Sequence, residues 1–285
     1  MAEFLAKSDK IETVFYPGLP DHEGHELAMK QMNGLGGGMI SFIVKGGRDK
    51  AAEKGRRLLD GRKRKYVNIF IAVAAFGSWI AMSLYGQSML AEPGLSNLRY
   101  FTVLSNLLTG IASVIWLTMS DRGGEGLRKA ETLKYVAAAA VGLTFTVVMV
   151  FLGPLYGYPM MFTGANLFFH LLVPLTAIAE IIFLSDAAYT ARDNMLAVIP
   201  TLIYGSIYLL NNYINGIGEW PDTNDWYSFL RWGYPVGIAI FAIACIITWL
   251  IGFMMRKCNA ARRLKNDGKD RFHEEEVQQV IQEDI

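Results

Sequence analysis

A threonine in one apolar segment and a histidine in another are the residues of this sequence that could do chemistry together. Thr102 offers a hydroxyl and His170 an imidazole, and His170 is the only histidine in the apolar part of the chain. A hydroxyl is a weak nucleophile until a neighbouring base accepts its proton, which an imidazole can do. Such a pair performs acyl transfer when another group orients the imidazole and donors stabilise the oxyanion. The alternative for His170 is a hydrogen bond that serves helix packing.

Further polar side chains accompany these two residues at helical spacing. Inside a bilayer such side chains are costly and usually face the interior of a bundle, which makes them candidates for function. They can also hold helices together by hydrogen bonds, and we prefer that interpretation for Thr109 and Ser113. One polar stripe contains Thr102, Ser105, Asn106, Thr109 and Ser113, and another contains Tyr204, Tyr208, Asn211, Asn212 and Asn215.

Five residues of these stripes and of the histidine segment are candidates to bind a substrate or to orient the histidine. Thr102 and His170 both lie about 6 to 8 Å inside their segments at 1.5 Å per residue, so they are expected at one level. Glu180 is expected about 15 Å deeper than His170, and we interpret it as a buried packing or pairing group rather than a triad acid. The candidates are Asn106, Asn166, Tyr208, Asn211 and Asn212.

The elements that must position these residues are apolar segments long enough to cross a hydrocarbon core of roughly 30 Å as helices. Of the 285 residues, 52% are hydrophobic, and they are clustered in these segments. This clustering excludes an ordinary soluble enzyme. Two cysteines provide neither a disulfide framework nor a cysteine-based metal site. We predict an all-α integral membrane protein with six helices at Tyr66 to Leu90, Leu98 to Met119, Leu133 to Leu152, Ala165 to Leu184, Met195 to Ile214 and Gly233 to Met255.

Lysine and arginine are enriched in the cytoplasmic loops of membrane proteins, so their distribution predicts the orientation of the helices. The only basic residues on the opposite side are Arg99 and Arg231, and its loops carry the acidic residues Glu92, Glu219, Asp222 and Asp225. Both termini are therefore expected in the cytoplasm of a multi-pass cell-membrane protein. The cytoplasmic set is Arg62, Lys63, Arg64, Lys65, Arg122, Arg128, Lys129, Lys134, Arg192, Arg256, Lys257, Arg262, Arg263 and Lys265.

The first 60 residues are polar and have a different character. Within Val14 to Gly47, the runs YPGLP and HELAMKQM and a glycine-rich turn lead into the strand-like MISFIVKGG. This stretch resembles part of the C-terminal domain of pyridoxal-phosphate transsulfuration enzymes, the cystathionine synthase and lyase family. We therefore expect a short soluble fragment of α+β character before the first helix, too short to bury its own core.

That resemblance does not deliver an active site. The chemistry of the family needs a Schiff-base lysine, a phosphate cup and a partner for the pyridinium nitrogen, and all of these lie outside the matching stretch. We expect no cofactor, and a name inherited from the fragment would not describe an activity. The domains are then the cytoplasmic fragment 1–60, the six-helix domain 66–255 and a charged cytoplasmic tail 256–285, of which HEEEVQQVIQ could form a short amphipathic helix.

The six-helix part carries a second resemblance. RYFTVLSNLLTG, from Arg99 to Gly110, and NLFFHLLVPLTAIAE, from Asn166 to Glu180, are similar to the androgen-induced protein family and its bacterial six-helix relatives. Animal members are intramembrane hydrolases of esters between a fatty acid and a hydroxy fatty acid. The resemblance implies Thr102 as the nucleophile and His170 as the base. In some family members we expect an acidic residue where this chain has Ser105 and Asn106.

The sequence thus favours an intramembrane threonine and histidine hydrolase of lipid esters that enter from the bilayer, with no nucleic-acid partner. Two other classes stay open. A small polytopic transporter could use the same polar interior as a pathway, and a non-catalytic membrane protein could use it for packing alone.

Overall fold

The computed structural model describes residues 37–86, 94–219 and 222–283, and most of the fragment that resembles the transsulfuration enzymes lies outside these ranges. The chain divides into two compact units. The larger unit, Leu58–Asp267, contains the apolar helices and every side chain discussed below. The smaller unit joins Met1–Arg57 to Gly268–Ile285.

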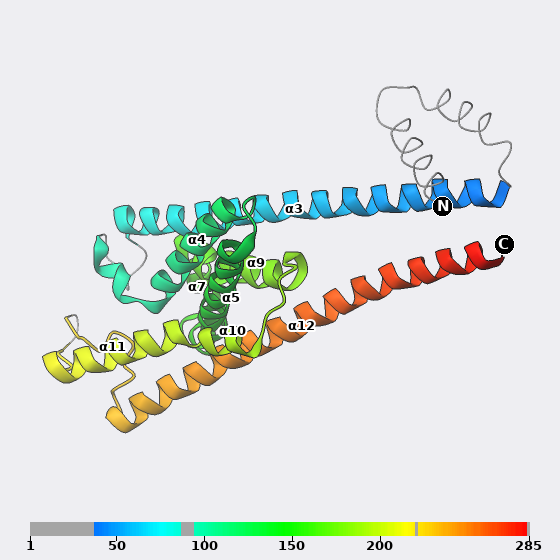
Figure 1. Ribbon diagram of the computed structural model, residues 1–285. Coiled ribbons are helices and arrows are strands. Elements are labelled where there is room, and N and C mark those ends of the chain that lie inside the picture. The colour runs from blue at the N-terminus through cyan, green and yellow to red at the C-terminus, as the bar shows by residue number, and fades with distance from the viewer. Residues whose placement is uncertain (1–36, 87–93, 220–221, 284–285) are drawn as a thin grey trace. The chain divides into compact units, whose positions relative to one another are not determined.

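The first described helix, α3, runs without interruption over Gly37–Tyr85 (Figure 1). The strand predicted at MISFIVKGG is therefore wrong, because these residues form the first turns of α3. A strand needs neighbouring strands to satisfy its backbone groups, whereas a helix satisfies them within itself. The described residues contain no strand, so this part of the chain is all-helical.

Among the residues that the structure describes, six helical segments are long and apolar enough to cross a membrane, as the sequence predicts. The last of them belongs to α12, Tyr234–Glu283, a single helix that also includes the predicted charged tail as far as it is described (Figure 1). The segments are Gly61–Tyr85, Phe101–Met119, Gly124–Tyr156, Ala165–Leu184, Ala191–Asn215 and Tyr234–Asn266.

Several of these segments are built from consecutive helical elements. After the short 3₁₀-helix η1, Leu95–Arg99, the second segment is the single helix α4, Phe101–Met119. The third is α5, Gly124–Val147, followed by η2, Val148–Leu152, and α6, Gly153–Tyr156; α7, Tyr158–Met161, follows in the next loop. The fourth contains α8, Ala165–Leu167, η3, Phe168–Leu172, α9, Val173–Ala179, and η4, Glu180–Leu184, and the fifth contains α10, Ala191–Leu196, and α11, Ile199–Asn215.

The predicted boundaries agree best for the fourth segment, whose ends coincide with those observed. They are too narrow for α5, which begins at Gly124 rather than near Leu133. The turns before Leu133 contain charged residues and so carry no hydrophobic signal, although one of these residues, Glu131, is buried in the bundle. Lys134, expected at the edge of a cytoplasmic loop, is 1% exposed.

Of the six described segments, the third, Gly124–Tyr156, is the most buried, and its helix α5 occupies the middle of the larger unit (Figure 1). Its central turns are rich in small residues, which let neighbouring backbones approach closely. A Cβ atom added at Gly142 would lie 2.9 Å from Ile251 of α12, so this glycine permits the contact between the two helices. The buried residues of α5 include Ala137, Ala138, Ala139, Ala140, Gly142 and Thr144.

The elements η2, η3 and η4 are π-helical turns, in which a backbone N–H donates to the carbonyl five residues earlier rather than four. Val173 N donates to Phe168 O at the end of η3, and Ser185 N donates to Glu180 O at the end of η4. Pro174 is the second residue after η3, and its missing N–H removes one donor from the backbone ladder there. A proline thus helps to explain why the helix widens at His170.

Candidate functional site

Thr102 lies half-buried in the first turn of α4. The chain after α11 holds this end of the helix. The hydroxyl oxygen of Tyr227 accepts a hydrogen bond of 2.8 Å from Phe101 N, and the Tyr204 hydroxyl donates to Arg99 O at 2.6 Å. Burial raises the pKa of Tyr227 well above its usual range, so the phenol keeps its proton. Tyr204 also packs on Phe101, with ring centroids 5.1 Å apart.

His170 lies in η3 and is 7% exposed. Its Nδ1 atom lies 2.8 Å from the carbonyl oxygen of Met161, at the end of α7. A carbonyl only accepts hydrogen bonds, so Nδ1 of the neutral ring carries the proton and Nε2 carries the lone pair. The group that orients the imidazole is thus a backbone carbonyl, which the pattern of residue types could not reveal.

Asn106 connects the helix of Thr102 to the turn that carries His170. Its Nδ2 donates to Thr102 O at 2.7 Å and to Phe169 O at 3.1 Å. Val103 and Phe169 belong to the same buried apolar cluster, so the two turns also pack against each other. The structure therefore brings together the turns that contain Thr102, Asn106 and His170.

The candidates in α11 bond mainly to the loop that follows that helix. Asn212 donates to Tyr208 O at 2.9 Å and to Asn224 O at 3.0 Å, and the Tyr208 hydroxyl donates to a carboxylate oxygen of Asp225. Asn211 accepts from Asn215 at 2.8 Å on the exposed side of the helix. These contacts fix the chain after α11. Asn166 is half-buried in α8, one turn before His170.

The other hydroxyls of the α4 stripe bond within α4 and to α5. Thr109 donates to Ser105 O at 2.8 Å and lies 3.3 Å from Ala137 O, and Ser113 donates to Thr109 O at 2.9 Å. The hydroxyl oxygens of Ser105 and Thr144 lie 3.1 Å apart. These contacts fit the packing interpretation that we prefer for Thr109 and Ser113.

A cluster of buried charges, which sequence reasoning did not assemble, lies at the end of the bundle that holds the Arg- and Lys-rich loops. Arg64 of α3 donates to both carboxylate oxygens of Glu131, at 2.6 and 2.7 Å, and to Glu180 at 2.5 Å. Lys134 lies 3.1 Å from Glu180 and donates to Ser113 at 3.0 Å. Two cations and two carboxylates therefore balance within the bundle, and Glu180 is a pairing group as interpreted above.

The carboxylate of Glu131 has further donors around it. Trp116 Nε1 donates at 2.8 Å, Ser185 Oγ at 3.1 Å and the Tyr189 hydroxyl at 3.0 Å. Burial, followed by the nearby Glu131 and Glu180 carboxylates, raises the pKa of Tyr189 well above its usual range. The phenol therefore stays protonated and remains a donor to Glu131.

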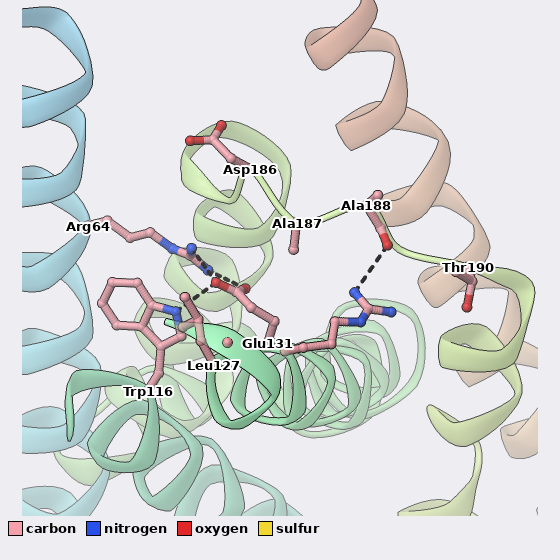
Figure 2. Close-up of a pocket in the computed structure, with 10 residues that line it drawn as sticks. Arg64, Trp116, Leu127, Glu131, Asp186, Ala187, Ala188 and Thr190 are labelled. Carbon is pink, nitrogen blue, oxygen red and sulfur yellow. Dashed lines mark hydrogen bonds and ion pairs between the residues drawn. The ribbon is translucent and has the colours of Figure 1, made fainter. Parts of the chain in front are cut away.

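A pocket of about 650 Å³ reaches the Arg64–Glu131 pair from the surface. Figure 2 shows the two side chains facing each other beside Trp116, while Asp186 points away from them. The remaining cation of the wall, Arg128, donates to Ala188 O at 3.1 Å and to Asp193 at 2.5 Å. Since the charges around this pocket are paired within the protein, its lining offers no net charge to a ligand.

Within the described ranges, no three His, Cys, Asp or Glu side chains come together as metal ligands would. The sequence signal for the ion cluster is a set of charged residues close to the predicted helix ends, including Arg64 and Lys134. The Lys/Arg rule places both residues on the cytoplasmic side but does not predict their burial.

Comparison with known proteins adds information on the N-terminal part. Residues 1–89 match the family of Cys/Met metabolism PLP-dependent enzymes, so the match extends beyond the resembling stretch and into the first apolar segment. An L-methionine gamma-lyase of Fusobacterium nucleatum subsp. polymorphum is 52% identical over 63 residues, which are 22% of this chain and 15% of that enzyme. An O-succinylhomoserine sulfhydrylase of Pseudomonas aeruginosa is 53% identical over 51 residues, 18% of this chain and 12% of the enzyme.

A cystathionine gamma-synthase of Mycobacterium leprae is 52% identical over 48 residues, 17% of this chain and 12% of that protein. The matches thus span less than a sixth of the length of these relatives. No solved structure matches the chain.

Proposed function

We propose that the chain is a six-helix membrane protein that hydrolyses lipid esters, with Thr102 as the nucleophile and His170 as the base. The observation that carries the proposal is the hydrogen bond between His170 Nδ1 and Met161 O. It selects the tautomer in which Nε2 is free to accept a proton, as a general base requires.

In the proposed reaction, the Thr102 oxygen attacks the carbonyl carbon of the ester while its proton passes to His170 Nε2. The tetrahedral intermediate then collapses, the ester C–O bond breaks, and His170 returns the proton to the leaving alcohol. Water attacks the resulting acyl-Thr102 ester with His170 as base, which releases the fatty acid and restores the hydroxyl. The proton balance closes on one imidazole, so the reaction needs no cofactor.

The packing of α4 against η3 supports this assignment. Asn106 binds the carbonyl of Thr102 and that of Phe169, the residue before His170. The segments around Thr102 and His170 also carry the resemblance to the androgen-induced protein family. The substrates of that family's animal members are esters of hydroxy fatty acids, so lipid esters are the substrate class that we propose.

The segment lengths and the distribution of lysine and arginine support a multi-pass location with both termini in the cytoplasm. Under this orientation the first turn of α4 is close to the outer leaflet. A lipid ester would reach Thr102 sideways from the bilayer, with its acyl chains among the phenylalanines near the site.

An activity-based fluorophosphonate probe provides the test. Detergent-solubilised wild-type protein should be labelled at one site, and Thr102→Ala should remove the label. Thr109→Ala is the matched control, because Thr109 lies two turns further along the same stripe and should leave labelling intact. Labelling that persists in Thr102→Ala would count against this nucleophile.

Transport is the second candidate, and the buried charges of Arg64, Glu131, Lys134 and Glu180 are the observation that favours it. Ionisable groups inside a bundle often mark ion or proton pathways. Against it, these four charges are paired with one another, and the hydroxyls of Thr109 and Ser113 donate to carbonyls of their own helix. A proton flux in liposomes that Glu180→Gln abolishes would favour transport.

For the N-terminal part, we propose that it has no transsulfuration activity. Its matches cover at most 15% of the relatives named above. A fragment of that size lacks most of the residues that bind and position the cofactor in a complete enzyme.

A further inference from the structure

The carbonyl of Phe169 lies where the backbone ladder of η3 has a gap. In this π-helical turn, donors pair with acceptors five residues earlier, as Val173 N does with Phe168 O. The next pair in that register would join residue 174 to Phe169 O. Residue 174 is a proline and has no N–H to donate. A buried carbonyl without a donor is unfavourable because it has lost its hydrogen bonds to water.

Asn106 supplies the donor that Pro174 cannot. Its Nδ2 lies 3.1 Å from Phe169 O and 2.7 Å from Thr102 O, and the residue is 0% exposed. An amide nitrogen carries two hydrogens, and these two bonds use both of them. Asn106 therefore cannot also donate to an oxyanion through Nδ2, and its contacts are those of a connector between two helices.

We propose that Asn106 is a positioning residue that holds the widened turn of His170 against the first turns of α4, by satisfying the carbonyl that Pro174 leaves without a backbone donor. The proposal rests on the proposed function, since the geometry being held is that of Thr102 and His170. An error of about 1 Å in such a pair can lower a rate about 100-fold without loss of the fold.

Asn68 of α3 provides a matched control. It is also 0% exposed, and its Nδ2 donates at 2.9 Å to the carbonyl four residues earlier, that of Arg64. Asn106 differs from Asn68 in its second hydrogen bond, which reaches Phe169 O in a different helical segment. Comparing Asn106→Ala with Asn68→Ala therefore separates the bond between helices from the loss of a buried amide.

The experiment combines kinetics on a panel of lipid esters with hydrogen exchange of the peptide that covers residues 165–175. We expect Asn106→Ala to lower kcat about 10- to 100-fold, with KM within about twofold, and to speed exchange in this peptide. Asn68→Ala should change neither kcat nor the rate of hydrogen exchange in this peptide. Pro174→Ala restores a backbone N–H, so adding Asn106→Ala in that background should lower kcat less than it does in the wild type.

The outcomes separate the two proposals. Wild-type protein that hydrolyses no ester and takes no probe would overturn the proposed function and, with it, the positioning role. Active wild-type protein with unchanged kcat in Asn106→Ala would overturn the positioning role alone. Unchanged exchange in Asn106→Ala, or an equal loss of kcat with and without Pro174, would overturn the link to the turn.

Discussion

Arg64 and Glu131 form an ion pair through two parallel hydrogen bonds of 2.6 and 2.7 Å, and it joins the first apolar helix to the most buried one. Both residues are nearly inaccessible, with exposed fractions of 7% and 5%. The guanidinium also lies 4.3 Å from the centre of the Trp116 ring. A planar guanidinium suits this geometry because it can bind a carboxylate and stack on an aromatic ring together.

Removing one partner of this pair should be costly. Glu131→Ala leaves Arg64 with Glu180 alone and removes the acceptor of Trp116, and we expect a loss of about 3 to 5 kcal/mol in the free energy of unfolding. Asp121→Asn breaks the exposed pair with Lys65 and should cost less than about 1 kcal/mol. Denaturant unfolding in detergent, followed by circular dichroism, measures both. Equal effects of the two changes would contradict this view of the cluster.

The second prediction concerns the close contact between α12 and its neighbours. A Cβ at Gly252 would lie 2.4 Å from the Asn194 side-chain oxygen and 3.2 Å from the Tyr135 hydroxyl, which bonds to Gly252 O. Gly252→Ala should therefore lower stability by about 1 to 3 kcal/mol. Gly77→Ala has open space around the new atom and should be neutral or slightly stabilising. Thermal unfolding of the two variants in one detergent provides the comparison.

The sequence predicts the number and approximate position of the helices because each carries a strong apolar signal. It cannot predict the details that arise from tertiary contacts. The Met161 carbonyl that orients His170 is part of the backbone, and the gap at Phe169 depends on the register of a π-helical turn. The burial of Lys134 depends on its pairing with Glu180 from another helix.

The strand predicted within MISFIVKGG shows that a local sequence pattern can also indicate the wrong structure. Its β-branched and apolar residues are typical of a strand in a complete enzyme domain, where neighbouring strands pair with it. In this chain the same residues form the start of α3. The sequence resemblance therefore did not predict the local structure of this segment.

Orientation can be tested by accessibility from outside the cell. After Cys245 and Cys258 have been replaced, single cysteines at Ser96, Thr163 and Asp222 should react with an impermeant thiol reagent on intact cells, since all three positions are exposed. Asp186→Cys, at an exposed position expected in the cytoplasm, should react only after the cells are opened. The reverse pattern would invert the proposed topology.

Cofactor binding can be tested independently of any substrate. We expect purified protein incubated with pyridoxal phosphate to show no aldimine absorbance, because a match to 15% or less of the length of the named relatives does not provide a complete binding site. Borohydride treatment followed by mass spectrometry checks the result. A stoichiometric adduct at one lysine would restore the transsulfuration hypothesis, whereas scattered labelling of surface lysines would not.

The final prediction concerns Thr102 and His170 as one catalytic unit. Hydrolysis of a panel of hydroxy-fatty-acid and simple lipid esters by solubilised protein should fall to background in Thr102→Val, which keeps the shape of the side chain but removes the hydroxyl. Thr102→Ser keeps a hydroxyl and should retain some turnover. His170→Ala should cost about as much as Thr102→Val, and the double variant little more, because members of a catalytic unit are strongly non-additive.

The same variants should keep the fold, since Thr102 is only half-buried and its substitute in Thr102→Val has nearly the same size. His170→Ala also loses the bond to Met161, so His170→Gln is the better control for stability, with an amide in place of the ring. Turnover that persists in both Thr102→Val and His170→Ala would exclude this pair. Independent, multiplicative losses would instead indicate that the two side chains act at separate places, and transport would then become the stronger explanation of the polar interior.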